Sequence, residues 1–96
     1  MTKLKIIYSP HLKFRLKVRE IPRLLPKQIF QGSREHYFDN QTGKFIAASR
    51  VKYKGRMREM AVIYDRDYEE IILITTHPLK NLQKSHRIKA RRWQKI

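Results

Sequence analysis

Four histidines, at positions 11, 36, 77 and 86, are the side chains of this sequence best suited to proton transfer near neutral pH. Phosphodiester cleavage without a metal requires a base, an acid and cations that stabilise the charge developing on phosphorus. Histidine and tyrosine can supply the first two, and arginine or lysine the third. His77 is the best placed, because it ends an apolar segment just before Pro78, where a rigid element opens into a loop.

Adjacent antiparallel strands would bring further charged groups to His77. In the expected sheet, the strand that ends at His77 lies beside the start of the strand that carries Arg58. Lys80 follows in the next element, Arg50 or Lys52 reaches the same end from a third strand, and Tyr64 lies at the far end. We therefore predict His77 as general base or acid and Arg58 and Arg50 as stabilisers of the pentacoordinate phosphate, with Tyr64 as a further catalytic candidate.

Each histidine also has a purely structural interpretation. His77 would be a hydrogen-bonded strand cap, His86 a packed residue, His11 an anchor for the first helix, and His36 a residue of an exposed strand. None has the His-x-x-x-His spacing with a neighbouring acid that is typical of a metal site, so we predict no metal site.

Basic residues recur at every second position across an expected hairpin. In extended structure this spacing sends the residues of one strand to one face, so Arg50 and Lys52 should project together. Only Glu59 lies close enough in sequence to neutralise them. The cluster predicts a phosphate-binding surface, and the alternative is a solvated edge that charge protects from aggregation. Its members are Arg50, Lys52, Lys54, Arg56 and Arg58.

The last eighteen residues carry seven basic residues and no acidic one. Residues 79–93 are predicted to form a helix whose apolar stripe packs on the sheet while its charges face a polyanion. A membrane surface is the alternative, which we disfavour because packing would consume the stripe. Trp93 is either the last core contact, as we predict, or a base-stacking platform. The stripe comprises Leu79, Leu82, His86, Ala90 and Trp93, and the predicted nucleic-acid contacts are Lys80, Lys84, Arg87, Arg91 and Arg92.

Several function classes are excluded by residues that the sequence lacks. Without cysteine there are no disulfides, thiolate metal sites or cysteine nucleophiles. There is no Gly-rich phosphate cradle and no Ser-His-Asp signature. Asp39 and Thr42-Gly43 are interpreted as turn chemistry. We expect no small-molecule cofactor.

The net charge of +15, from 23 Lys and Arg against 8 Asp and Glu, points to a polyanionic partner, with nucleic acid first. Ninety-six residues, 41% of them hydrophobic, suit one folded domain. The N-terminus lacks the apolar stretch of a signal peptide, and no run approaches the ~18 apolar residues of a membrane span. We therefore expect a cytoplasmic protein with no membrane association.

Capping residues, turn residues and apolar spacing predict the elements that position these side chains. Ser9 caps a helix that starts at Pro10. The run Ile71–Ile74 is apolar on both faces, which predicts a central strand in which Ile72 and Ile74 share a face. The first helix has two candidate apolar stripes, one formed by Phe14, Val18 and Ile21 and the other by Leu12 and Leu16.

The predicted order is an α+β domain with one strand, two N-terminal helices, a four-stranded antiparallel meander and a C-terminal helix. The strands are expected over residues 3–8, 35–39, 44–53, 57–65 and 69–77, and the helices over 10–20, 27–30 and 79–93.

Four short segments and this order of elements carry a resemblance to a known family. The segments are His11-Leu12-Lys13-Phe14-Arg15 with Arg19, Tyr37-Phe38-Asp39 before Thr42-Gly43, Met60-Ala61-Val62-Ile63-Tyr64, and Ile74-Thr75-Thr76-His77-Pro78. They are similar to the BrnT-like branch of the RelE-like ribonuclease toxins and its uncharacterised relatives, as a single domain over residues 1–96. The resemblance implies a metal-independent endoribonuclease of a toxin–antitoxin system, held inactive by an antitoxin protein. A BrnT-like protein would usually end with an Arg-rich strand-to-helix segment, which His77-Pro78 replaces here.

Two functions from different classes fit these features. The first is a toxin-like endoribonuclease that binds RNA through Arg and Lys and cleaves it with a His, Tyr and Arg set. The second is a catalytically silent nucleic-acid-binding module of the same fold. A third interpretation, in which an acidic protein covers the basic face, overlaps with the first because an antitoxin would do this.

Overall fold

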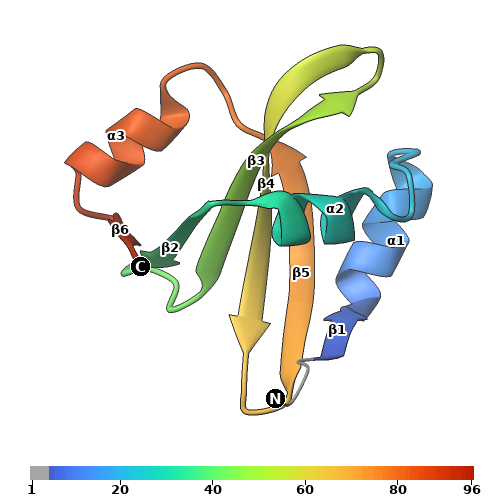
Figure 1. The fold of residues 1–96 in the computed structure, drawn as a ribbon, viewed down its shortest axis with the longest axis horizontal. Helices are drawn as coiled ribbons and strands as arrows, with labels where there is room; N and C mark the ends of the chain where they lie inside the picture. The colour runs from blue at the N-terminus through green and yellow to red at the C-terminus, as the bar shows by residue number, and fades with distance from the viewer. Residues whose placement is uncertain (1–4) are drawn as a thin grey trace.

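A computed structural model describes residues 5–96 and shows helices arranged around a twisted sheet (Figure 1). The mixed α+β class is confirmed, and the part of the predicted first strand that precedes Lys5 lies outside the described residues. The elements are β1 (Lys5–Tyr8), α1 (Pro10–Val18), α2 (Leu25–Gly32), β2 (Glu35–Asp39), β3 (Phe45–Tyr53), β4 (Arg56–Arg66), β5 (Glu70–Pro78), α3 (Gln83–Lys89) and β6 (Trp93–Lys95).

Six strands form the sheet, in the order β1-β5-β4-β3-β2-β6. β2 to β5 are consecutive antiparallel neighbours, so the predicted meander is confirmed. β1 pairs with β5 in parallel, which places β5 inside the sheet, as its apolar run predicted. β6 extends the opposite edge by pairing with β2. The sheet therefore has one strand more than the sequence predicted.

α1 begins as predicted but buries only one of its two candidate stripes. The Ser9 hydroxyl accepts a hydrogen bond from the Leu12 backbone N–H at 3.0 Å, which caps the helix. Leu12 and Leu16 are buried, whereas Phe14 and Val18 are 67% and 63% exposed. Phe14 and Val18 are therefore wrong as core contacts, whereas Ile21, the third member of their stripe, is buried beyond the end of α1.

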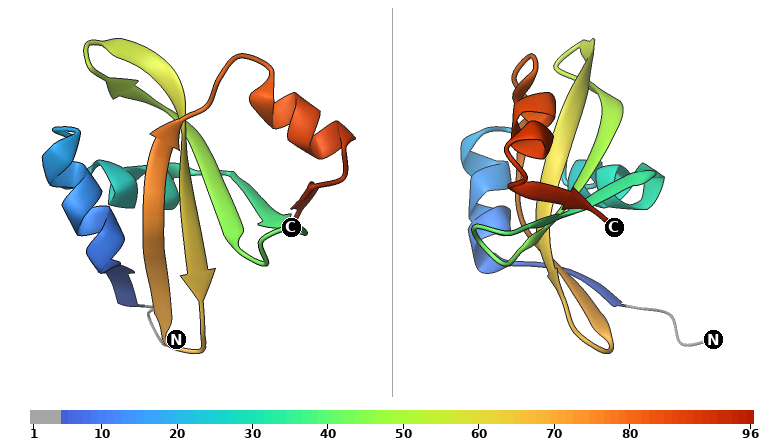
Figure 2. Two further views of the ribbon diagram at one scale, coloured as in Figure 1. Left: turned by 180° about the vertical axis from the view of Figure 1, so that it is seen from behind. Right: turned by 90° about the vertical axis from the view of Figure 1, so that its left-hand side faces the viewer.

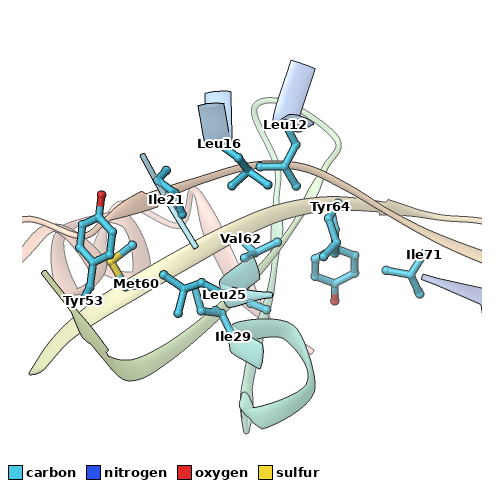
Figure 3. Packing of buried hydrophobic residues seen from close by; sticks show 12 residues of the cluster. Leu12, Leu16, Ile21, Leu25, Ile29, Tyr53, Met60, Val62, Tyr64 and Ile71 are labelled. Carbon is cyan, nitrogen blue, oxygen red and sulfur yellow. The ribbon is translucent and has the colours of Figure 1, made fainter. Parts of the chain in front are cut away.

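Two apolar clusters cover opposite sides of the sheet. Figure 3 shows the larger, in which Leu25 and Ile29 of α2 pack on Val62 of β4, together with the buried residues of α1. We call this side the α2 face. On the other side, the α3 face, Leu79 and Trp93 cover the smaller cluster. α2 and α3 accordingly lie on opposite sides of the sheet (Figure 2).

A β-bulge interrupts the pairing of β4 with β5. Tyr64 pairs with Leu73 and Ile63 with Thr75, which leaves Ile74 without a partner on β4. The Ser9 hydroxyl donates a hydrogen bond to the Ile74 carbonyl at 3.0 Å. Ser9, which caps α1, thus also donates a hydrogen bond to the carbonyl of the bulge residue.

The bulge and the strand pairing decide which residues of β5 enter the larger core. Ile71 and Leu73 are 3% and 0% exposed, whereas Ile72 and Ile74 are half-buried. Ile72 faces the α3 side and Ile74 is the unpaired bulge residue. The side chains that anchor β5 are therefore Ile71 and Leu73, and not the pair predicted from the sequence.

The last helix is much shorter than the predicted one. Leu82 has a left-handed φ of 63°, so α3 begins at Gln83, and Arg91, with a φ of 59°, turns the chain into β6. Leu79 and Trp93 are buried, as predicted, but Leu82 between them is 59% exposed. The continuous apolar stripe is therefore wrong. Among residues 5–96, no helix has the length and apolar content of a membrane span.

Candidate nucleic-acid interface

The β3–β4 hairpin extends beyond the strands on either side of it (Figure 1). β2 pairs with β3 only as far as Ala48, and β5 pairs with β4 only from Met60. Residues 49–59 therefore form a two-stranded projection, which we call the hairpin arm. It turns at Lys54 and Gly55, whose φ angles of 51° and 78° are the positive values that tight hairpins require.

Five basic residues of the hairpin arm are divided between its two faces. Cross-strand register puts Arg50 and Lys52 on the α3 face and Arg56 and Arg58 on the α2 face, with Lys54 at the tip. Arg58 is half-buried and the other four are exposed. The predicted projection of Arg50 with Lys52 is confirmed.

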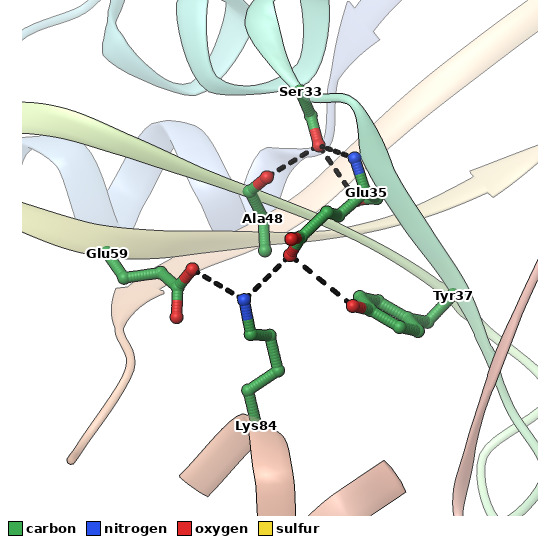
Figure 4. Close-up of polar contacts among 6 residues, drawn as sticks. All are labelled: Ser33, Glu35, Tyr37, Ala48, Glu59 and Lys84. Atoms are coloured by element: carbon green, nitrogen blue, oxygen red, sulfur yellow. Dashed lines mark hydrogen bonds and ion pairs between the residues drawn. The ribbon is translucent and has the colours of Figure 1, made fainter. Parts of the chain in front are cut away.

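Glu59, the one acidic residue of the hairpin arm, is already paired with a lysine (Figure 4). Its carboxylate lies 2.8 Å from Nζ of Lys84 in α3, and Lys84 also contacts Glu35 of β2 at 2.7 Å. Burial opposes the charged form of Lys84, but the two carboxylates outweigh it and raise its pKa above the usual value. Within residues 5–96, the five arm cations consequently have no carboxylate partner.

Two of the predicted nucleic-acid contacts in the C-terminal segment are also held in ion pairs with the sheet. Lys84 bridges Glu35 and Glu59, and Nε of Arg92 lies 3.3 Å from Oδ1 of Asp39. Acids from distant strands supply these partners, which a count of charges within residues 79–96 does not reveal. Lys84 and Arg92 therefore hold the C-terminal segment on the sheet.

The other predicted contacts of this segment are open to solvent. Lys80 and Arg87 line a shallow hollow beside α3, together with His86. Arg91 is exposed, and its carbonyl accepts a hydrogen bond from Nδ2 of Asn40 at 2.9 Å. Lys80, Arg87 and Arg91 are thus the predicted contacts of this segment that a ligand can reach.

The contacts of the Asp39 carboxylate predict how the stability of the protein depends on pH in the acid range. Burial alone would raise the pKa of Asp39, but hydrogen bonds from the Gln41 backbone and from Arg92 outweigh it, so the pKa lies below its usual value. Because the pKa is lower in the folded state, this stabilisation is present above the unfolded value of about 4 and is lost as pH falls through the folded value. We expect Asp39→Asn to be less stable at pH 7 and to lose less stability on acidification, as measured by urea unfolding. Equal acid dependence in both proteins would contradict this role.

His77 lies near the end of β5 on the α3 face, where it pairs with Ala61. Its Nδ1 is 3.1 Å from the carbonyl oxygen of Pro78. A carbonyl only accepts, so this contact requires a proton on Nδ1, and Nε2 is then the proton-free nitrogen of the neutral ring. The strand-cap hydrogen bond considered for His77 therefore leaves a basic nitrogen available.

The structure does not bring the four predicted catalytic residues together. His77 and Arg50 lie on the α3 face, whereas Arg58 and Tyr64 lie on the α2 face, because side chains alternate along β4. Tyr64 is only 3% exposed, and its hydroxyl lies 2.8 Å from Nδ1 of His36. Burial raises the pKa of the Tyr64 phenol. The predicted convergence of Arg58 on the phosphate beside His77 is therefore absent, and Tyr64, which was predicted at the far end, is on the opposite face as well.

A second group of cations was missed in the sequence. Lys13 and Lys17 of α1, Arg23 of the following loop and Lys27 of α2 border one hollow. The available signal was the four-residue spacing of Lys13 with Lys17, which places this pair one helical turn apart on α1. Arg23 lies in the loop before α2, so its spacing from Lys27 gives no helical signal. The two pairs are separated in sequence, so the sequence did not indicate that they lie around the same hollow.

Comparison of the chain with family models, curated proteins and solved structures finds no significant match. Within residues 5–96, no three His, Asp or Glu side chains gather in a way that would hold a metal ion.

Proposed function

We propose that this protein binds RNA through the hairpin arm and the exposed cations beside α3. The observation that carries the proposal is the uncompensated charge of the arm, in which five cations lie close together while Lys84 occupies the one local carboxylate, Glu59. Like charges gathered in this way repel one another, and a phosphate backbone relieves that repulsion while releasing its counterions.

The two cationic regions meet on one side of the sheet. Arg50 is the cross-strand neighbour of Glu59, and Glu59 contacts Lys84 of α3, so the arm and α3 adjoin at this ion pair. Lys80 and Arg87 flank the same helix. An RNA strand that contacts Arg50 on the arm can therefore continue over α3.

Removing two arm cations should weaken RNA binding in a salt-dependent way. We expect the double variant Arg50→Ala/Lys52→Ala to bind a labelled single-stranded RNA less tightly than wild type in fluorescence anisotropy. The slope of log affinity against log salt should become shallower by about 1.4, which corresponds to two lost phosphate contacts on a single strand.

The matched control is Lys17→Ala/Lys27→Ala, which removes the same charge from the hollow between α1 and α2. It should retain the wild-type salt slope. An equal loss in both double variants would mean that net charge alone governs binding, and would contradict an interface on the hairpin arm.

We further propose that the protein cleaves the bound RNA, as a metal-independent toxin-like endoribonuclease. The observation that favours cleavage is the contact of His77 Nδ1 with the Pro78 carbonyl, on the same face as Arg50, because it leaves Nε2 able to accept a proton when the ring is neutral. His77 would take the proton of a 2′-hydroxyl, whose oxygen attacks the adjacent phosphorus, and Arg50 would stabilise the charge that develops there. The bond from phosphorus to the 5′-oxygen of the next nucleotide then breaks, and the 5′-oxygen takes a proton from water, which leaves a 2′,3′-cyclic phosphate. Arg58 and Tyr64, on the other face, have no part in this proposal.

The order of the elements supports the resemblance to RelE-like toxins, with β1, α1 and α2 before the meander and α3 after it. An acidic antitoxin would then cover the cations of the interface, and the protein would act in the cytoplasm. The alternative is a silent RNA-binding module with the same interface. The two differ only in whether His77 performs chemistry.

A further inference from the structure

A hollow of about 640 Å³ lies between β1, α1 and α2. Its floor is aliphatic, formed by Ile6, Leu16, Ile21 and Leu24. Leu24 is 62% exposed, which leaves a large apolar side chain in contact with water. The volume falls within the range of about 300–1,000 Å³ that is typical of small-molecule sites.

The charged residues that line this hollow are all cationic. Lys13, Lys17, Arg23 and Lys27 surround the aliphatic floor, and no acidic residue lines it. All four are exposed, and within residues 5–96 none forms an ion pair with a carboxylate. The four charges therefore repel one another across an apolar surface.

The Tyr8 hydroxyl joins the walls of the hollow. It donates a hydrogen bond to the Arg23 carbonyl at 2.7 Å and accepts one from the Lys27 backbone N–H at 3.2 Å. β1 is thus tied both to the loop before α2 and to the first turn of α2. These bonds fix the elements around the hollow relative to one another, which lowers the ordering cost of binding.

We propose that this hollow binds a nucleoside diphosphate, with the base on the aliphatic floor and the two phosphates between the four cations. A ligand with one negative charge, such as a fatty acid, would leave most of the repulsion in place. A phosphate ion alone would leave the floor in water. A nucleoside diphosphate combines several negative charges with a base that can cover the floor, so it satisfies both features. This proposal is independent of RNA binding by the hairpin arm.

Isothermal titration of the full chain with four probes tests the ligand class. ADP should bind more tightly than pyrophosphate, which offers only the charge, and than adenosine, which offers only the base. It should also bind more tightly than decanoate, which combines an apolar chain with one charge. Equal affinity for ADP and pyrophosphate, or tighter binding of decanoate, would overturn the proposal.

Three variants locate the site. Lys17→Ala/Lys27→Ala should weaken ADP binding by at least about tenfold, the usual effect of losing a charge-assisted contact. Leu24→Ala, at an exposed position, should weaken ADP binding but not pyrophosphate binding. The matched control Arg50→Ala/Lys52→Ala should bind ADP as wild type does.

The variants also separate this proposal from the RNA interface. Loss of ADP binding in the Arg50→Ala/Lys52→Ala control, or its retention in Lys17→Ala/Lys27→Ala, would place the nucleotide elsewhere and overturn the proposal. Failure of the RNA prediction would leave the ADP results unaffected. Circular dichroism of each variant confirms that it remains folded.

Discussion

Replacing Leu73 by Ala should lower the free energy of unfolding by about 2–5 kcal/mol, the usual cost of a cavity in a packed core. Leu73 is fully buried in β5, where its neighbours in the pairing are Tyr8 of β1 and Tyr64 of β4. Few side chains can move into the space, because strands flank it on both sides. A small domain has only about 5–15 kcal/mol of stability, so the variant should be close to unfolding. Urea denaturation followed by circular dichroism measures the change.

The adjacent Ile72→Ala provides the matched control. Ile72 faces the α3 side and is half-buried, so less apolar surface is lost and the remaining side chains can relax. We expect it to cost less than half as much as Leu73→Ala. The opposite ranking would mean that β5 presents its other face to the larger core.

Replacing His77 by Ala should reduce RNA cleavage by about 10²–10⁴-fold, because a positioned proton-transfer group contributes this much to a rate. RNA affinity should change little, since the proposed contacts to phosphate come from the arm and from α3. Cleavage of a labelled RNA by the purified protein, with affinity measured in parallel, separates the two effects.

Two controls accompany His77→Ala. His86→Ala removes an exposed imidazole from α3, and Tyr64→Phe removes a hydroxyl from the α2 face; both should cleave RNA as wild type does. If His77→Ala cleaves RNA as fast as wild type, His77 is only a strand cap. If the wild-type protein binds RNA without cleaving it, the silent module is the function.

The elements that the sequence predicted well are specified by neighbouring residues. Ser9 and Pro10 start α1 where a serine cap and a proline in the first turn favour a helix start. The turn after β2 contains Gly43 with a φ of 74°, and Asp39 accepts a hydrogen bond from the Gln41 backbone. Such signals lie within a few positions of the structure that they specify, so one sequence suffices to detect them.

The C-terminal segment was mispredicted because its conformation depends on distant partners. Residues 79–93 have the spacing of a helix. Asn40, however, donates hydrogen bonds to the carbonyls of Arg91 and Arg92, and the chain continues from there as the extended strand β6. Trp93 then packs beside Tyr37, with their ring centroids 5.7 Å apart. The apolar spacing within residues 79–93 carries no information about these contacts with the turn at Asn40.

The candidate site was predicted in its charges but not in its arrangement. Alternation correctly placed Arg50 with Lys52, because one strand contains both. The pairing of Lys84 with Glu59, and the separation of Arg58 from His77, depend on how strands and α3 pack. Composition shows which charges exist, and only the packing shows which of them remain free.

The bulge at Ile74 determines which face of the sheet His77 occupies. If Ile74 paired with Ile63, the alternation that pairs Tyr64 with Leu73 would continue, and His77 would oppose Met60 in the larger core. Because Ile74 is left out of the pairing, His77 opposes Ala61 on the face that carries Arg50. In evolutionary terms, a change that let Ile74 pair would bury the imidazole without any substitution at position 77.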